Sequence, residues 1–280
     1  MKISDECNDC LSKLAAQASA FATDDLAVRD DSRRAAEKVL NEKLKPGIVS
    51  IEVATPMHHV IKHMSGNPDP YRKFKDIEIK EARKLFSLVK DNYRESFVEY
   101  LRLAALGNSI DFFKPIEELG KEVRENRLEF TIDDSGLLEG KVKQSSLVLY
   151  LADNSGEVYF DMPLLRLMRR YARTIYVVKE APVQNDVTID DIRRAGLQKE
   201  AGEVMTTGTA TPGVLLSLAS DEFKQAFEAA DFVFTKGMGY YETLEELAPH
   251  GKIFFCLKAK CGPVARSLGV PLNSYVAKLY

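Results

Sequence analysis

The sequence of 280 residues lacks the features of several protein classes. Its four cysteines are too few to stabilise a chain of this length as a disulfide scaffold. No apolar run approaches the roughly 18 residues that a membrane span needs, and residues 1–7 lack the apolar segment of a signal peptide. We therefore expect a cytoplasmic protein that has no membrane partner and keeps its cysteines as thiols or metal ligands.

An excess of basic residues is also missing. The chain has 39 Lys and Arg against 42 Asp and Glu, a net charge of -3, and the two signs are interleaved. Proteins that bind the phosphate backbone of nucleic acids usually carry a basic excess or a basic stripe. We therefore expect no nucleic-acid partner. Because the chain has only four histidines, a carboxylate is the better candidate for any general base.

Several motifs of nucleotide-binding proteins and phosphatases are absent. The dinucleotide fingerprint G-x-G-x-x-G fails because Gly237 and Gly239 are followed by Glu242, and the Walker pattern G-x-x-x-x-G-K-[ST] is missing. There is no G-x-S-x-G elbow, and no cysteine precedes a phosphate-binding loop that ends in arginine. The D-x-D pair of haloacid-dehalogenase-type phosphatases is also absent, so a covalent aspartyl phosphate is not indicated.

The chain does have the composition of a globular protein, 45% hydrophobic and 29% charged, enough for one large or two ordinary domains. Up to residue 143 the apolar spacing is mostly helical, and Thr55-Pro56 predicts a helix start. From residue 144, apolar runs alternate with helical segments, which is typical of a parallel sheet. The predicted strands are 147–151, 174–178, 203–206, 232–235 and 253–257, with a further candidate at one sheet edge, 274–278. We predict an α/β fold: a helical N-terminal domain, 1–143, then a Rossmann-like α/β/α core with a mostly parallel sheet, 144–280.

Polar residues follow each predicted strand of the second half, and the carboxyl ends of parallel strands meet at one crevice. The first strand is an apolar run that stops at Asp153 and Asn154. The polar positions after successive strands are Asp153, Asn154, Gly156 and Glu157; Asn185 and Asp186; Gly208 and Thr209; Lys236 and Gly237; and Lys258, Lys260 and Cys261. Such residues populate any strand-to-helix loop for turn and capping reasons, but their recurrence at successive strand ends favours a site.

Three of these residues form a candidate metal site. Asp153, Asp186 and the amide oxygen of Asn154 make a hard, oxygen-only ligand set that suits magnesium or manganese. A divalent ion held there can bind a phosphate group and lower the pKa of a bound water. Glycines let backbone N–H groups approach an anion, helix N-termini favour negative charge, and Lys236 would add a positive charge. The pattern therefore favours phosphate chemistry.

Other candidate residues lie in the helical half. Asn108 and Asp111 stand at a helix end, where they either cap backbone groups or point into a cleft to position water. Asp69 lies in a rigid loop with two prolines and has the same two interpretations. His59 and His63 are spaced to share a helix face, but no H-E-x-x-H accompanies them, which favours a structural role over metal binding.

The cysteines are a separate question. Cys7 and Cys10 have C-x-x-C spacing, which fits two ordinary thiols on a first helix, a redox pair or a metal site. If Cys261 joins them, the three thiols would form a second metal site or a disulfide.

Four motifs together resemble the metal-dependent damage-control phosphatases, a family long catalogued as a domain of unknown function. They are D-N-S-G-E at 153–157, N-D-V-T at 185–188, K-G-M-G-Y-Y-E at 236–242 and G-N-S-I-D at 107–111. G-N-P-D-P-Y at 66–71 and K-A-K-C at 258–261 extend the resemblance over nearly the whole chain. The early cysteine pair with the late cysteine resembles the compact archaeal and bacterial branch. Tyr240 and Tyr241 depart from the asparagine or phenylalanine that often precedes the glutamate, which bears on the substrate.

The resemblance implies a helical part packed on a Rossmann-like core, with a metal at positions matching Asp153, Asn154 and Asp186. It also implies hydrolysis of phosphorylated small metabolites, often damaged or unwanted sugar phosphates. We predict manganese, magnesium, cobalt or nickel as the cofactor, and Lys236, Asn108 and Asp111 as further catalytic residues. The predicted substrate-binding residues are Gly156, Glu157, Asn185, Gly208, Thr209, Gly237, Asp69 and Lys260.

The alternative hypothesis is a Rossmann-type protein that binds a nucleotide or S-adenosylmethionine, such as a methyltransferase, without phosphatase activity. The missing glycine fingerprint weakens it. Thermal stabilisation by divalent metals favours the phosphatase, whereas stabilisation by the adenosyl cofactor alone favours the alternative.

Overall fold

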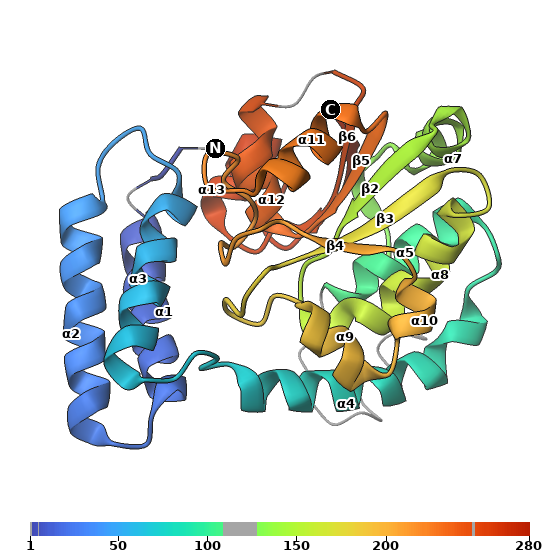
Figure 1. The fold of residues 1–280 in the computed structure, drawn as a ribbon. Coiled ribbons are helices and arrows are strands. Elements are labelled where there is room, and N and C mark those ends of the chain that lie inside the picture. The colour runs from blue at the N-terminus through green and yellow to red at the C-terminus, as the bar shows by residue number, and fades with distance from the viewer. Residues whose placement is uncertain (1, 5, 109–127, 248–249) are drawn as a thin grey trace.

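The computed structural model describes residues 2–4, 6–108, 128–247 and 250–280. Within them, one seven-stranded sheet has the strand order β1-β7-β6-β5-β2-β3-β4 (Figure 1). Neighbouring strands are parallel except β6 and β7, which are antiparallel. The strands are β1 Phe130–Asp133, β2 Leu147–Leu151, β3 Arg173–Val178, β4 Val204–Thr206, β5 Phe232–Lys236, β6 Ile253–Lys258 and β7 Tyr275–Leu279. The chain therefore has the predicted α/β fold with a mostly parallel sheet.

The five predicted parallel strands are all present, and their ends differ from the prediction by no more than one residue. The predicted edge position of the last strand is wrong. β7 lies inside the sheet because β1 pairs along its outer side, with Phe130 opposite Tyr275 and Asp133 opposite Ala277. β1 was not among the predicted strands, and its four residues form the true edge.

Helices cover both faces of the sheet, and the alternation of side chains along β2 divides the core in two. Val148 and Tyr150 face one layer, whereas Leu149 and Leu151 face the other. The first layer contains α4 Arg72–Val89, α5 Phe97–Gly107, α7 Ser135–Gln144, α8 Val158–Met168, α9 Ile189–Ala195 and α10 Gln198–Ala201. The second contains α11 Asp221–Ala229, α12 Met238–Leu244 and α13 Gly262–Leu268. Short 3-10 turns complete these connections at η1 Lys90–Asn92, η2 Ser155–Glu157 and η3 Glu245–Leu247.

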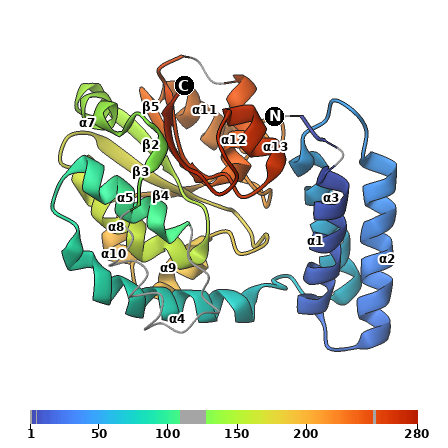
Figure 2. The ribbon, with the colours of Figure 1, turned by 180° about the vertical axis from the view of Figure 1, so that it is seen from behind.

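The first three helices form an N-terminal helical unit beside the sheet (Figures 1 and 2). They are α1 Glu6–Ala22, α2 Leu26–Lys43 and α3 Ser50–Ser65, and they share a core of their own that includes Leu11, Leu40 and Met57. The predicted start of α3 at Thr55 is wrong. The carboxylate of Glu52 accepts the N–H of Val49 at 2.9 Å, which caps the helix earlier and leaves Pro56 inside it.

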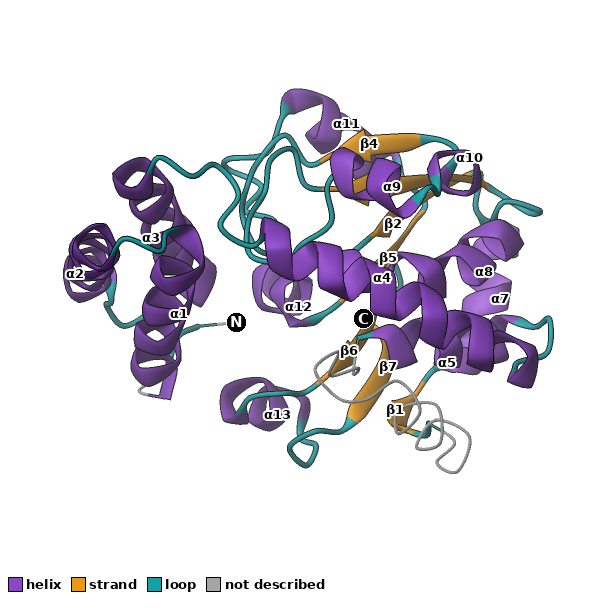
Figure 3. Cartoon of the chain, turned by 90° about the horizontal axis from the view of Figure 1, so that it is seen from below, coloured by secondary structure: helices purple, strands orange, loops and turns teal. Residues whose placement is uncertain are grey.

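Not all of the helical half belongs to this unit. α4 extends from it along the sheet's first helical layer, as Figures 1 and 3 show. Leu85, Leu101 and Leu138, which precede residue 144, are fully buried in the same core as Val148. The predicted domain boundary after residue 143 stays a prediction. The hydrophobic core of α1–α3 is separate from the core that α4, α5 and α7 share with the sheet. None of the described helices combines the length and hydropathy of a membrane span.

Candidate active site

Two segments meet at the carboxyl ends of β2 and β3. The N–H of Val187 donates to the carbonyl oxygen of Asp153 at 2.8 Å, and the N–H of Ser155 donates to that of Asn185 at 2.8 Å. Between these bonds, Asn154 and Asp186 form an isolated antiparallel bridge. The main chain therefore holds the three predicted metal ligands, Asp153, Asn154 and Asp186, next to one another.

The amide groups around Asp153 are oriented by carboxylates. Asn108 Nδ2 donates to Asp153 Oδ2 and to Glu157 Oε1, both at 2.7 Å. Asn154 Nδ2 donates to the same two atoms, at 3.1 and 2.7 Å. Because both amide nitrogens are used in this way, the amide oxygens are turned away from the carboxylates. Asn108, predicted to cap a helix or to point into a cleft, lies against Asp153 in the structure.

Buried oxygen atoms without hydrogen-bond partners make this a suitable cation site. Among the described residues, Asn108 Oδ1 and Asp186 Oδ2 are buried and accept no hydrogen bond. Lys179 Nζ lies 3.4 Å from Asp186 Oδ2 as an ion pair. Buried oxygens normally have partners, so Asn108 Oδ1 is a position where a ligand is expected. The set of two carboxylates and amide oxygens fits a divalent metal such as magnesium or manganese.

The charged groups at the site shift one another's pKa. Burial, followed by the charges of Glu157 and Asp186, raises the pKa of Asp153 well above its ordinary value, and Lys260 and Lys179 oppose this. Burial also raises the pKa of Asp186, against the effect of Lys179. Negative charge gathered away from water is costly, and a bound dication would relieve that cost.

Gly237 allows this arrangement sterically. Its φ of +82° lies in the region that only glycine adopts freely, and a Cβ there would lie 2.0 Å from Asp153 Oδ2. The predicted role of Gly237 was close approach to a phosphate. The structure shows that its missing side chain makes room for the carboxylate of Asp153.

Lys236 has different surroundings from those predicted. Its ammonium group is buried, lies 2.6 Å from Asp161 Oδ1 and also pairs with Glu157. Burial alone would lower the pKa of Lys236, but the charges of Asp161 and Glu157 hold it above its ordinary range. The hydroxyl groups of Tyr150 and Tyr176 donate to Asp161 at 2.8 and 2.7 Å. Lys236 is not among the described residues that line the cavity.

Two charged residues of the site were not predicted. Lys179, which follows β3, is fully buried and donates to the hydroxyl oxygen of Tyr240 at 2.9 Å. Glu78 of α4 accepts hydrogen bonds from Asn185 Nδ2 at 3.0 Å and Ser155 Oγ at 3.3 Å. Burial raises the pKa of Glu78 to about 8. Lys179 could have been found as the first polar residue after a buried strand, whereas nothing in the sequence marks Glu78 within its amphipathic helix.

Of the remaining residues predicted to bind substrate, some lie at the cavity and others do not. Asn185 and Lys260 line the cavity, and Gly156 is buried in η2 beside Glu157. Gly208 packs against Ser220, where an added Cβ would lie 2.3 Å from the serine Cβ, and Thr209 accepts the N–H of Glu180 at 3.3 Å. Asp69 pairs with Lys75 at 3.7 Å. Gly208, Thr209 and Asp69 are thus held elsewhere, and Asp111 lies outside the described residues.

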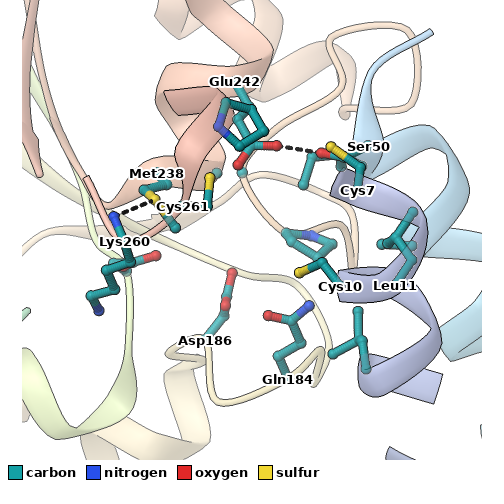
Figure 4. A pocket seen from close by; sticks show the side chains of 18 of the residues that line it. Cys7, Cys10, Leu11, Ser50, Gln184, Asp186, Met238, Glu242, Lys260 and Cys261 are labelled. Atoms are coloured by element: carbon teal, nitrogen blue, oxygen red, sulfur yellow. Dashed lines mark hydrogen bonds between the residues drawn. The ribbon is translucent and has the colours of Figure 1, made fainter. Parts of the chain in front are cut away.

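A cavity of about 430 Å³ opens between the site and the N-terminal helical unit. Asn108, Asp153, Asn154, Asn185 and Asp186 line one side, and residues of α1 and α3, including Leu11, Leu14 and Ile51, line the other. Figure 4 shows Met238 and Glu242 above the cavity and Lys260 on the side away from α1, with Ser50 of α3 hydrogen-bonded to Glu242. Tyr240 and Tyr241, the departures from the family pattern, are fully buried and do not line it in the described chain.

The three predicted cysteines meet at this cavity. Cys7, Cys10 and Cys261 all line it and all are free thiols (Figure 4). Burial is the main cause that raises the pKa of Cys10 and of Cys261. Within the described ranges, no group of three or more His, Cys, Asp and Glu side chains is arranged to hold a metal. The second metal site and the disulfide therefore stay predictions.

Comparison with known proteins shows which family the chain belongs to. The family model described as the damage-control phosphatase ARMT1-like domain matches residues 3–276. The chain belongs to this family. Damage-control phosphatase PH1575 of Pyrococcus horikoshii is 38% identical, over 99% of this chain and 97% of that protein. A damage-control phosphatase of Archaeoglobus fulgidus is 32% identical, over 100% of this chain and 99% of that one.

Further relatives extend the comparison. The uncharacterized protein MJ0202 of Methanocaldococcus jannaschii is 33% identical, over 99% of this chain and 95% of that protein. The crystal structure of PH1575, described as a DUF89 family protein, superposes with a TM-score of 0.93 at 36% identity, covering 100% of this chain and 99% of that one. Fold and family are confirmed, and the names of the relatives support a phosphatase role. The assignment to the branch with an N-terminal cysteine pair stays a prediction.

Proposed function

We propose that this chain is a divalent-metal-dependent phosphatase that hydrolyses phosphate monoesters of small metabolites, including damaged or unwanted sugar phosphates. The observation that carries the proposal is the group formed by half-buried Asp153 and Asn154 and buried Asp186, beside a cavity large enough for a small metabolite. The partnerless Oδ1 of Asn108, together with the Asp186 carboxylate that pairs with Lys179, supports a cation there.

Asp153, Asn154 and Asp186 would hold manganese, magnesium, cobalt or nickel. When bound, the metal would neutralise phosphate oxygens and make a bound water more acidic. Asn108 orients Asp153 through its 2.7 Å hydrogen bond, and Glu157 fixes the amides of both Asn108 and Asn154.

The positive charges have separate tasks. Lys260 lines the cavity and would stabilise the phosphate oxygens as charge develops in the transition state. Lys179 balances Asp186, and Lys236 balances Glu157 and Asp161, so both act as positioning residues. We propose Lys260 in place of Lys236 as the lysine that contacts substrate.

The test is phosphate release with each of the four metals, for Asp153→Asn and for a control, Asp221→Asn. Asp221 lies in α11, is 90% exposed and pairs with Lys224 at the surface. Asp153→Asn should lose activity on the order of 10³-fold or more, and should lose the rise in Tm that metal gives the wild type. The control should keep both. Metal-dependent turnover that survives in Asp153→Asn would contradict the proposal, as would stabilisation by S-adenosylmethionine with no metal effect.

A further inference from the structure

Gln184 has a backbone conformation that glutamine rarely adopts. Its φ is +45°, and Asn273 is the other non-glycine residue with positive φ in the part of the chain that the structure describes. Asparagine tolerates this region, whereas a longer side chain is strained in it. Strained residues persist where the surrounding structure holds them, and they gather at functional sites. Gln184 lines the cavity, close in sequence to Asp186.

His58 of α3 holds the side chain of Gln184. The Nε2 atoms of the two residues lie 3.2 Å apart, and His58 is only 4% exposed. Burial, with a smaller effect of Lys62, lowers the pKa of His58 to about 4, so its ring is neutral near pH 7. A neutral ring with its proton on Nδ1 accepts at Nε2, and the amide nitrogen of Gln184 donates to it.

This contact fixes the direction of the amide oxygen. With its nitrogen turned to His58, Gln184 presents its oxygen on the side of Asp186 (Figure 4). Gln184 lines the cavity, and within the described ranges its amide oxygen accepts no hydrogen bond. A fixed acceptor beside a phosphate site fits a hydroxyl donor on the part of the substrate next to the ester.

We propose that Gln184 is a specificity residue that accepts a hydrogen bond from a hydroxyl group of the substrate's alcohol part, and that His58 is its positioning residue. The inference rests on the proposed phosphatase function and adds a determinant of its substrate class. It joins the N-terminal helical unit to the sheet side of the cavity, because His58 belongs to α3 and Gln184 to the loop after β3.

The experiment compares two phosphate esters in the metal-loaded enzyme. Ribose 5-phosphate has hydroxyl groups on its alcohol part, and p-nitrophenyl phosphate has none. Gln184→Gly should raise KM for ribose 5-phosphate about tenfold, the effect of one lost hydrogen bond, and change KM for p-nitrophenyl phosphate less than about twofold. Because glycine relieves the positive φ, the Tm of Gln184→Gly should not fall.

Two further variants separate function from structure. Asn273→Gly is the matched control: it changes the other left-handed residue, outside the cavity lining, and should leave both KM values unchanged. His58→Phe keeps a ring but removes the acceptor, and should raise KM for ribose 5-phosphate as Gln184→Gly does. The double variant should be no worse than either single one.

The outcomes are distinguishable. Equal KM changes for both esters, or no change for ribose 5-phosphate, would overturn the inference while the phosphatase function stands. Wild-type turnover of p-nitrophenyl phosphate but not of ribose 5-phosphate would also overturn it. Absence of metal-dependent turnover of either ester by the wild type would overturn the proposed function, and the inference with it.

Discussion

The two sides of the cavity differ in how they are built. The side formed by the sheet edge carries buried charges that are tied by hydrogen bonds, as between Asn108, Asp153 and Glu157. The side formed by α1 and α3 is mostly apolar and is lined by Leu11, Leu14 and thiols. Its polar contacts with the sheet side are single hydrogen bonds, such as Ser50 with Glu242 and His58 with Gln184. Under the proposed function, the sheet side would perform the phosphate chemistry, and the helical side would position a residue that selects the substrate.

The largest expected effect tests the sheet side. Gly237→Ala places a methyl group 2.0 Å from Asp153 Oδ2 at a φ of +82°, so the carboxylate must move. We expect metal-dependent phosphate release to fall by at least about 100-fold, because small displacements of catalytic groups cost that much. Gly140→Ala in α7 is the control: nothing lies within 4 Å of the added Cβ, and activity should be unchanged. An active Gly237→Ala would show that Asp153 is not a ligand.

The next effect concerns the buried charges beneath the site. Lys236→Met leaves Glu157 and Asp161 buried without their cation, which should lower the free energy of unfolding by about 3–5 kcal/mol. Chemical denaturation measures the change. Adding Asp161→Asn should recover part of the loss, since one uncompensated charge is then removed. If Lys236→Met instead keeps full stability and loses only activity, the lysine contacts substrate as the sequence alone suggested.

A smaller effect tests the helical side through pH. His58 has a pKa of about 4 in the folded protein and about 6.5 in the unfolded chain. As the pH falls from 7 to 5, the unfolded state therefore binds a proton at His58 and the folded state does not. Stability should therefore fall by about 2 kcal/mol more between pH 7 and 5 in the wild type than in His58→Phe. The groups that face His58 are Lys62 on its own helix, the Tyr71 ring and the uncharged Gln184. Parallel pH profiles of the two proteins would refute this assignment.

The smallest effect is expected at the outer contact between the two sides. Glu6 of α1 pairs with Arg266 of α13 at 2.8 Å, and both side chains are more than half exposed. Exposed pairs contribute little, so Glu6→Gln should change the free energy of unfolding by less than about 1 kcal/mol. It should also leave KM for both esters unchanged. A large rise in KM would show that this pair holds the helical side in place.

Much of the fold could be predicted from local pattern. Apolar runs such as Leu147–Leu151 mark buried parallel strands because both of their faces need partners. β1 could not be found in this way, since its four residues alternate between half-buried and exposed and depend on pairing with β7. Residues that form a strand only through a distant partner leave no local signal.

The site could be predicted in part for the same reason. Asp153, Asn154 and Asp186 were found because they follow strands, and the structure brings them together. The environment of Lys236 was not predicted, although the sequence contains the signal for it. Side chains alternate along a strand, so Lys236 lies on the same face of β5 as Phe232 and Phe234, which is the face toward α8. The role of Gln184 could not be predicted, because its positive φ and its contact with His58 depend on tertiary structure.

The short bridge between Asn154 and Asp186 has a consequence for cation binding. It joins through main-chain atoms the two loops that carry the proposed metal ligands, so those side chains would not have to be gathered from separate segments. A preorganised site loses little conformational entropy on binding, and its affinity should depend on ligand chemistry more than on folding. Exchange of one divalent metal for another should then change turnover without changing the backbone around residue 154.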